Sequence, residues 1–369
     1  DGDLDLYVTN ENGSDQCFKN QDGKFADASE TFGLAASKSQ RSVSIGDFNS
    51  DGLPDLLVAK NSNAKIASAN NIKKTNWSNE SEIRFLTDGN KFDRYFLRAP
   101  IFDSQLANCS AVADINSDGK PDLIIGNGGL SRLPLDDSLR LANVAGDGQL
   151  TETLEQAHRQ GLSMASRQRN CCFLNIGSAG FAELSSISGL DLPDDTRAIA
   201  TTDWDHDGDL DVITTSRSGP QLRIFINVFN RRNAVSFRLF GNQSNRDAIG
   251  ASVELYFEQQ DQPLVKTVQA GSGFRSQSSK RLVFAIQSGR KIQQAVVRWP
   301  TGRVQQIQNV SDGAMIEVHE GDASVVEKTN DRFRLNIRGS VLVGTKGEPA
   351  EEKRVALFPR PTMPAIEMQ

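Results

Sequence analysis

The sequence DINSDGKPD at residues 114–122 decides the fold, because its pattern returns as DFNSDGLPD at 47–55 and as DWDHDGDLD at 203–211. Oxygen-bearing side chains occupy the first, third, fifth and ninth places of each copy, and glycine occupies the sixth. Alternating oxygen ligands around a sharp glycine turn are how a short loop surrounds a hard cation, and a backbone carbonyl at the seventh place completes the shell. The pattern therefore predicts both bound calcium and a repeated structural unit.

The predicted calcium ligands are read directly from these places. The first loop contributes Asp47, Asn49, Asp51 and Asp55, with the carbonyl of Leu53. The second contributes Asp114, Asn116, Asp118 and Asp122, with the carbonyl of Lys120. The third contributes Asp203, Asp205, Asp207 and Asp211, with the carbonyl of Asp209. Residues 1–5 read DGDLD, which we interpret as a fourth copy cut by the start of the chain, with Asp1 and Asp5 as ligands.

These loops do not fit the EF-hand pattern, which needs a bidentate glutamate at the twelfth place and a helix on each side. The twelfth residues are Val58, Ile125 and Thr214, and short apolar, β-branched runs typical of buried strands flank the loops. Each loop is therefore expected to join two strands. The alternative is a hairpin turn that binds nothing, but turn chemistry does not require a carboxylate at the ninth place.

Composition excludes several classes of function. The net charge of the 369 residues is −6 without a basic stripe, which argues against nucleic-acid binding. No apolar run approaches the roughly 20 residues of a membrane-spanning helix. The four cysteines, at positions 17, 109, 171 and 172, are expected to be buried free thiols, with disulfides as the alternative. The neighbours Cys171 and Cys172 are expected to point to opposite faces of a strand.

The repeat unit extends beyond the acidic loop. The ninth-place residues Asp5, Asp55, Asp122 and Asp211 are separated by 50, 67 and 89 residues, so the unit recurs with insertions. A hairpin flanked by aromatic residues follows at 17–25, 84–92 and 172–181. One metal hairpin and one aromatic hairpin make four strands per unit, which predicts an all-β propeller, with a stacked solenoid as the alternative.

The chain divides into three parts on these patterns. Residues 1–232 are predicted to form propeller blades, with a surface excursion at 61–82 and a short helix within 133–168. Residues 233–321 lack acidic loops and alternate with period two between turns, which predicts a compact antiparallel β-domain. Residues 322–369 are expected to hold a short β segment, around 333–337 and 340–343, and a proline-rich linker.

The acidic loops with their aromatic hairpins resemble FG-GAP (VCBS) repeats, the units of the integrin α-subunit propeller. The second domain resembles the ASPIC/UnbV domain in four ordered blocks: NRDAIGA at 245–251, AGSGF at 270–274, QSSKRL at 277–282 and VRWPTG at 297–302. Residues 1–321 are thus similar to the cartilage acidic protein family and its bacterial relatives. The resemblance implies a calcium-loaded propeller, here partial because around seven blades are usual, and the missing ones are expected at the amino end.

The resemblance also implies a secreted, periplasmic or cell-surface protein. We expect a calcium-binding module for recognition or adhesion, whose partner is an extracellular protein or glycan. An enzyme acting on polysaccharide is one alternative, and a scaffold for a further C-terminal domain is another. Catalysis is not expected, because the three histidines, at 158, 206 and 319, have no matching nucleophile or base motif and the paired aspartates are assigned to calcium.

Overall fold

The computed structural model describes residues 4–10, 13–34, 40–60, 82–87, 91–96, 107–128, 169–192, 194–216, 220–228, 233–259, 262–287, 289–322 and 325–328. Within these ranges the chain is almost entirely β, with one short α-helix, α3 (Ser185–Ser188), and one 3-10 turn, η1 (Gly177–Ala179). The all-β prediction is confirmed. The expected excursion at 61–82, apart from Glu82, lies outside the described residues, as do the helix within 133–168, the strands at 333–343 and Asp1.

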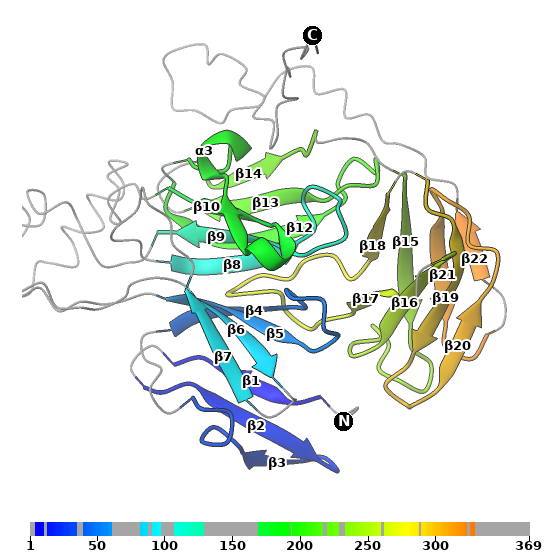
Figure 1. The fold of residues 1–369 in the computed structure, drawn as a ribbon, viewed down its shortest axis with the longest axis horizontal. Coiled ribbons are helices and arrows are strands. Elements are labelled where there is room, and N and C mark those ends of the chain that lie inside the picture. Colours follow the sequence, from blue (N-terminus) through cyan, green and yellow to red (C-terminus); the bar gives the residue numbers. More distant parts are fainter. Residues whose placement is uncertain are drawn as a thin grey trace, which may run out of the picture.

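Four sheets form successive blades along the chain, shown from blue to green in Figure 1. The first blade contains β1 (Leu6–Val8), β2 (Gln16–Gln21) and β3 (Lys24–Asp27). The second contains β4 (Gln40–Gly46), β5 (Asp55–Lys60), β6 (Glu82–Thr87) and β7 (Lys91–Phe96). The third contains β8 (Ala107–Ala113), β9 (Asp122–Asn127), β10 (Cys171–Asn175) and β11 (Phe181–Glu183). The fourth contains β12 (Thr196–Thr202), β13 (Asp211–Ser216) and β14 (Leu222–Phe225).

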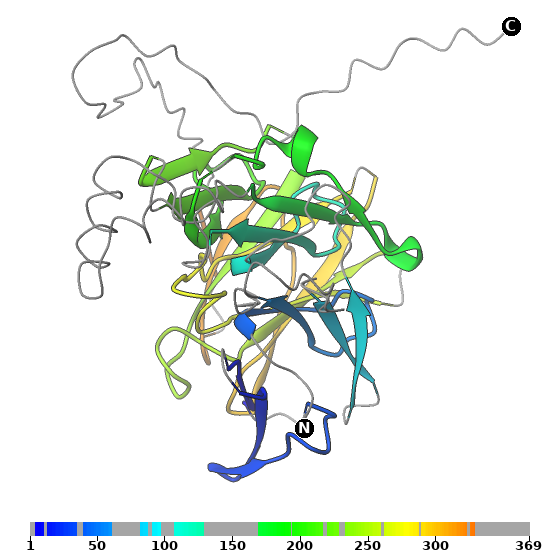
Figure 2. The ribbon, with the colours of Figure 1, turned by 90° about the vertical axis from the view of Figure 1, so that its left-hand side faces the viewer.

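Each complete acidic loop joins the first two strands of a blade, as the flanking sequence predicted. The loops connect β4 to β5, β8 to β9 and β12 to β13, all in antiparallel register. The aromatic hairpins supply the outer strands, such as β10 and β11. The first strands β4, β8 and β12 lie next to one another, so the blades share an inner edge (Figures 1 and 2). This repetition places all three loops at the same end of the blades.

The core of the blades lies between neighbouring sheets, because alternate side chains of one strand face opposite neighbours. In β9, Leu123 and Ile125 pack in the cluster shared with the second blade, whereas Ile124 packs in the cluster shared with the fourth. Cys171 and Cys172 divide between the same two clusters, and all four cysteines are buried free thiols. Both predictions about the cysteines are confirmed.

A buried ion pair joins the first two blades. Arg84 of β6 is 1% exposed, and its Nη1 lies 3.1 Å from Oδ2 of Asp15, which is also fully buried. Tyr7 donates a hydrogen bond of 2.7 Å from its hydroxyl to the same carboxylate. Since an unpaired buried charge is costly, this group fixes how the first blade sits against the second.

The second domain is a sandwich of two four-stranded sheets. One sheet has the order β18 (Leu282–Ile286), β15 (Asn233–Phe240), β21 (Met315–His319) and β22 (Val325–Lys328). The other has the order β17 (Leu264–Thr267), β16 (Ser252–Phe257), β19 (Ile292–Arg298) and β20 (Val304–Ile307). Their inner faces enclose an apolar core that includes Phe237, Phe284 and Trp299.

One pairing corrects the expectation of a wholly antiparallel second domain. Strands β15 and β21 run parallel, with Phe237 opposite Ile316. The reason is topological: the chain returns to the first sheet only after crossing the second sheet through β19 and β20, so it re-enters in the direction of β15. Strand β22 then pairs with β21, so this sheet continues past the predicted boundary at residue 321.

Candidate metal centres and the cleft beside them

The backbone of each acidic loop is folded around its first carboxylate. In the second loop, Asp114 accepts hydrogen bonds from the backbone N–H groups of Asp118 at 2.9 Å and Gly119 at 3.0 Å. Ser117 and Gly119 have φ angles of 57° and 90°, and this left-handed turn is favourable for glycine at the sixth place. In the first loop Asp47 accepts the equivalent bonds from Asp51 at 3.1 Å and Gly52 at 3.0 Å.

The third- and fifth-place side chains also turn toward the loop. The side-chain oxygen of Asn116 accepts the N–H of Asp118 at 3.1 Å, and Oδ1 of Asp118 accepts the N–H of Lys120 at 2.9 Å. Asn49 and Asp51 make the same contacts in the first loop. In the third loop Asp203 accepts the N–H of Asp207 at 3.0 Å. In the first two loops, the oxygens of the first, third and fifth places therefore gather on one side of the backbone.

The ninth-place aspartate has a structural role that the ligand pattern did not predict. Asp122 is fully buried, and its two oxygens accept N–H groups of Ile115 in its own loop and Asn175 on β10, both at 2.9 Å. Asp55 accepts from Phe48 and Leu86, both at 2.9 Å. Asp211 accepts from Trp204 and Asn227, both at 2.7 Å. Each ninth carboxylate thus ties its loop to the third strand of the same blade.

The asparagines at these strand ends continue the connection to the preceding blade. Asn175 donates from Nδ2 to the carbonyl of Phe48 in the first loop at 2.8 Å. Asn227 donates in the same way to the carbonyl of Ile115 in the second loop at 2.8 Å. Sequence reasoning missed this contact, although the tripeptide Phe-x-Asn recurs at 18–20, 173–175 and 225–227 and could have revealed it.

The fourth acidic segment, at residues 1–5, is represented by Asp5. Its Oδ1 accepts the N–H of Asn20 on β2 at 2.8 Å, which is the contact that a ninth-place residue makes to its third strand. The structure therefore places Asp5 in the same position as Asp122 in its blade, as the repeat predicted.

Burial and mutual repulsion make these carboxylates unfavourable as isolated anions. Burial is the largest cause of the rise in the pKa of these carboxyl groups. Nearby aspartates raise the pKa further, whereas the N–H bonds of the loops lower it. The pKa rises to about 6 for Asp55, about 8 for Asp122, about 6 for Asp203 and about 7 for Asp211. The pKa values of Asp47 and Asp114 are raised as well. A cation beside them would favour the charged form.

The donor set fits a hard cation. Asp203, Asp205 and Asp211 each place a carboxylate oxygen within 4.8 Å of the others. The predicted side-chain ligands of the three complete loops are all aspartate or asparagine, so the donors are oxygen atoms, which calcium and magnesium prefer. The structure brings together the first-, third- and ninth-place carboxylates of the third loop. The assignment of these and of the other predicted ligands to a metal ion, including the seventh-place carbonyls, stays a prediction.

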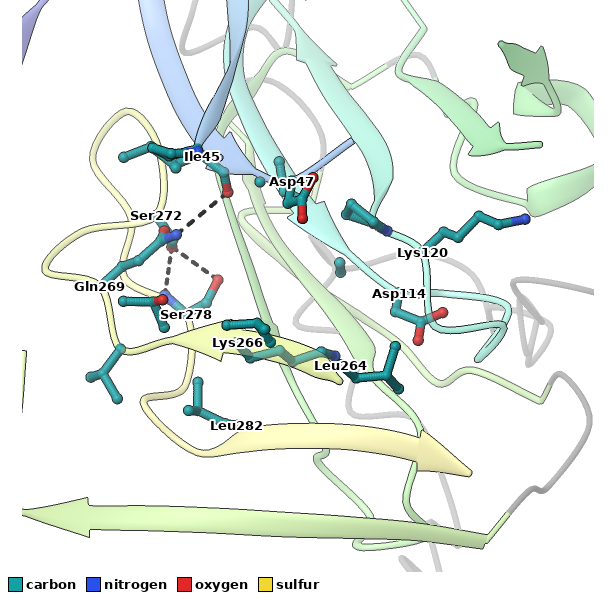
Figure 3. A pocket seen from close by; sticks show the side chains of 18 of the residues that line it. Ile45, Asp47, Asp114, Lys120, Leu264, Lys266, Gln269, Ser272, Ser278 and Leu282 are labelled. Carbon is teal, nitrogen blue, oxygen red and sulfur yellow. Dashed lines mark hydrogen bonds between the residues drawn. The ribbon is translucent and has the colours of Figure 1, made fainter. Parts of the chain in front are cut away.

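A cleft with a volume of about 1960 Å³ separates the first two acidic loops from the second domain. Asp47 and Asp114 lie on its blade side, and Lys266 on β17 lies on the opposite side (Figure 3). Lys266 is attracted by Asp114 and Asp122, and it donates a hydrogen bond to the carbonyl of Val283. The blade side of the cleft therefore carries Asp47, Asp114 and Lys120, and the opposite side carries lysine and glutamine side chains.

A glycine- and serine-rich loop of the second domain closes one end of the cleft. Gly273 lies so close to β8 that a Cβ atom there would be 2.2 Å from the carbonyl oxygen of Ser110. The N–H of Phe274 donates to Oγ of Ser42 at 3.1 Å, and Oγ of Ser44 donates to the carbonyl of Ser272 at 3.3 Å. The loop thus reaches the shared inner edge of the blades, where Ser42 and Ser44 both contact Ser110.

The same loop also binds the fourth blade. The N–H of Ser279 donates to the carbonyl of Thr201 at 3.0 Å, and the N–H of Thr201 donates to Oγ of Ser278 at 3.0 Å. Three successive blades therefore contact the segment 272–279, which runs from the AGSGF block into the QSSKRL block. These residues have a domain-docking role that sequence patterns alone did not assign.

Other residues of the four ASPIC-like sequence blocks either pack in the core of the second domain or form ion pairs within it. Trp299 is 3% exposed in the core. Asp247 pairs with Lys280 and, at 3.6 Å, with Arg238. Lys280 contributes the strongest of the attractions that lower the pKa of Asp247, and Arg246 contributes the weakest.

Comparison with known families agrees with the order of the two parts. A model described as "FG-GAP-like repeat" matches residues 1–58, one described as "FG-GAP repeat" matches 110–150, and one described as "ASPIC and UnbV" matches 241–325. The chain thus carries FG-GAP repeats followed by an ASPIC/UnbV domain.

Comparison with individual proteins adds little. No curated protein matches the chain. Among solved structures, a streptogramin B lyase matches at 10% identity with a TM-score of 0.24, covering 88% of this chain and 89% of that one. This similarity is too weak to carry an argument about fold or activity. None of the helices in the described ranges is long and apolar enough to cross a membrane.

Proposed function

We propose that this chain is a calcium-binding recognition module that acts outside the cell or at its surface. The observation that carries the proposal is the convergence of oxygen donors in the acidic loops, seen most directly in Asp203, Asp205 and Asp211. FG-GAP repeats often bind calcium and are typical of extracellular and cell-surface proteins, which supports the same conclusion.

In this proposal the first, third, fifth and ninth side chains of each loop hold the ion, together with the seventh-place carbonyl. Bound calcium supplies positive charge that offsets the repulsion between buried carboxylates. The loop's own N–H bonds to its first-place aspartate set the turn, and the bonds to the ninth-place aspartate anchor it to β6, β10 or the end of β14. Calcium would therefore stabilise a loop whose shape the chain already encodes.

The cleft between the loops and the second domain is the proposed recognition surface. Its volume of about 1960 Å³ exceeds the roughly 300–1,000 Å³ of ordinary small-molecule pockets, so an extended ligand suits it better. Asp47 and Asp114 on one wall and Lys266 and Gln269 on the other supply charges and hydrogen-bonding groups. A segment of extracellular protein or a glycan is the class of partner with matching chemistry.

Binding accounts for these features better than catalysis. FG-GAP repeat domains are typically non-catalytic. Of the two histidines in the described ranges, His206 belongs to the third loop and His319 stacks on Phe240 with ring centroids 4.8 Å apart. The carboxylates that could act as a catalytic pair are the proposed calcium ligands.

The assignment is tested by calorimetric titration of calcium into the wild-type chain and the Asp118→Ala variant. We expect the variant to bind one calcium ion fewer, because Asp118 is the fifth-place ligand and lies close to solvent, with its side chain 25% exposed. The control is Asp93→Ala, which removes a carboxylate that is 63% exposed on β7. An unchanged number of bound ions in Asp118→Ala would remove the second loop from the proposal.

A further inference from the structure

The seventh residue of the third loop differs from its counterparts in the other two loops. The first loop has Leu53 at this place and the second has Lys120, so the fold of the loop needs no carboxylate there. Leu53 packs beside the apolar cluster between the first two blades, and the Lys120 side chain is 41% exposed. The third loop has Asp209, which is 4% exposed and therefore cannot be solvated in the usual way.

The Asp209 carboxylate is buried without any hydrogen-bond donor. Both oxygens, Oδ1 and Oδ2, lack a partner. The charged groups that act on it are the carboxylates of Asp207, Asp211 and Asp205, all of which repel it, and its side-chain contact with Asp207 also disfavours the charged form. Burying an anion among other anions without a partner costs several kcal/mol, so a compensating positive charge is needed.

We propose that Asp209 binds the metal ion of the third loop through its side chain, which makes this loop a five-carboxylate site and the tightest of the three. This inference rests on the proposed calcium function and adds a ligand to it. The first two loops have three carboxylates each, at the first, fifth and ninth places, whereas the third has Asp203, Asp205, Asp207, Asp209 and Asp211. Because calcium affinity in oxygen sites rises with ligand charge, the third loop should be filled first.

The third loop also contains its own spectroscopic probe. Trp204 is its second residue, whereas the first and second loops have Phe48 and Ile115 there. A terbium ion, which replaces calcium in oxygen sites, emits strongly when a nearby indole transfers its excitation energy. Terbium emission excited through tryptophan therefore reports on the third loop, and its loss in Trp204→Phe would establish that assignment.

The experiment is a terbium titration, with calcium competition, of the wild-type chain, Asp209→Asn and Asp209→Leu. Asp209→Leu introduces the residue that the first loop uses at the same place, so it keeps the backbone carbonyl as a ligand. We expect affinity at the third loop to fall by about tenfold or more in both variants, as is usual when a metal site loses a supporting group. Asp22→Asn removes an equal charge on the distant β2–β3 turn and should leave the affinity unchanged.

Three outcomes separate this inference from the proposed function. Unchanged terbium affinity in both Asp209 variants would overturn the inference and leave the calcium sites intact. Unchanged terbium affinity in Asp209→Asn, together with reduced affinity in Asp209→Leu, would show that Asp209 acts as a neutral hydrogen-bonding group. That result would also overturn the inference. A wild-type chain that binds neither terbium nor calcium would refute the proposed function itself. Calorimetric calcium binding at the first two loops verifies that each variant is folded.

Discussion

The side chain of Gln287 in the second domain donates a hydrogen bond of 2.9 Å from Nε2 to the backbone carbonyl oxygen of Asp118, the fifth residue of the second acidic loop. Leu264 on β17 also approaches this loop, because a Cβ at Gly119 would lie 3.5 Å from Leu264 Cδ2. The second domain therefore rests on a loop that we propose to be a metal site, so order in the loop should affect how the domains dock.

Gln287→Ala should weaken this docking mainly in the presence of calcium. A lost hydrogen bond costs about 0.5–1.5 kcal/mol, and the cost should shrink in chelator because the loop is then less ordered. Denaturant unfolding of the variant in calcium and in chelator measures both values. The control is Gln293→Ala, an exposed residue on β19. Equal losses in both conditions would show that the contact is independent of the metal.

The ninth and fifth places of a loop should respond differently to substitution. Asp122→Asn should lower the free energy of unfolding by about 1–3 kcal/mol even in chelator, because the amide group cannot accept both N–H bonds with its two terminal atoms. Asp118→Asn should leave chelator stability nearly unchanged and reduce only the calcium effect. Unfolding curves with and without calcium distinguish a structural residue from a metal ligand. Similar curves for Asp122→Asn and Asp118→Asn would contradict the structural role of Asp122.

Gly271 and Gly273, in the glycine- and serine-rich loop that joins the second domain to the blades, provide a matched test of the contact between the domains. Gly273→Ala should disrupt docking, because the new Cβ would lie 2.2 Å from the carbonyl oxygen of Ser110. Gly271→Ala also has a positive φ, 85°, but no atom within 4 Å, so it should cost only the roughly 1–2 kcal/mol of a left-handed residue. Thermal unfolding and small-angle scattering would show domain separation in Gly273→Ala alone. Equal loss of stability and equal scattering in the two variants would mean that the close approach of Gly273 to Ser110 does not hold the domains together.

Glu320 should make the second domain sensitive to acid. Its carboxylate accepts N–H groups of Asn242, Gln243 and Ser244 at 2.6–2.9 Å, and such bonds lower its pKa to about 2 although burial opposes them. A carboxylate with a depressed pKa contributes stability that is fully present above its unfolded pKa of 4.5 and is lost as the pH falls toward 2.

Glu320→Gln should therefore lower the unfolding midpoint at pH 7 and flatten the loss of stability between pH 4.5 and 2. Unfolding monitored by near-ultraviolet circular dichroism over this pH range measures the difference. Glu327→Gln, on the exposed face of β22, is the control. A variant that keeps the wild-type pH profile would show that Glu320 does not carry this acid sensitivity.

The sequence allowed the prediction of features that depend on local pattern. The loop positions of Asp47, Asp114 and Asp203, the strands on either side, and the opposite facing of Cys171 and Cys172 all follow from short-range periodicity and turn chemistry. The second domain's strands were also largely predictable, because alternation of buried and exposed residues extends over each one.

Features that depend on packing between distant segments could not be predicted. The contacts of Asn175 with Phe48 and of Phe274 with Ser42 join residues more than 100 positions apart. The burial of Asp209 depends on the surroundings of its loop, since the same place is occupied by leucine and lysine in the other copies. Period and spacing contain no information about such surroundings, and for this reason Asp209 was expected to contribute only its carbonyl.

The most direct test of the central claim is the thermal unfolding midpoint of the chain in excess chelator, in about 10 mM calcium and in equal magnesium. With extracellular-type affinities of ~10⁻⁴–10⁻³ M, each filled loop should add about 1.4–2.7 kcal/mol, so calcium should raise the midpoint by several degrees. Magnesium should have little effect, because it gives up its bound water reluctantly. A midpoint that is the same in chelator and calcium would contradict the claim that these loops hold calcium.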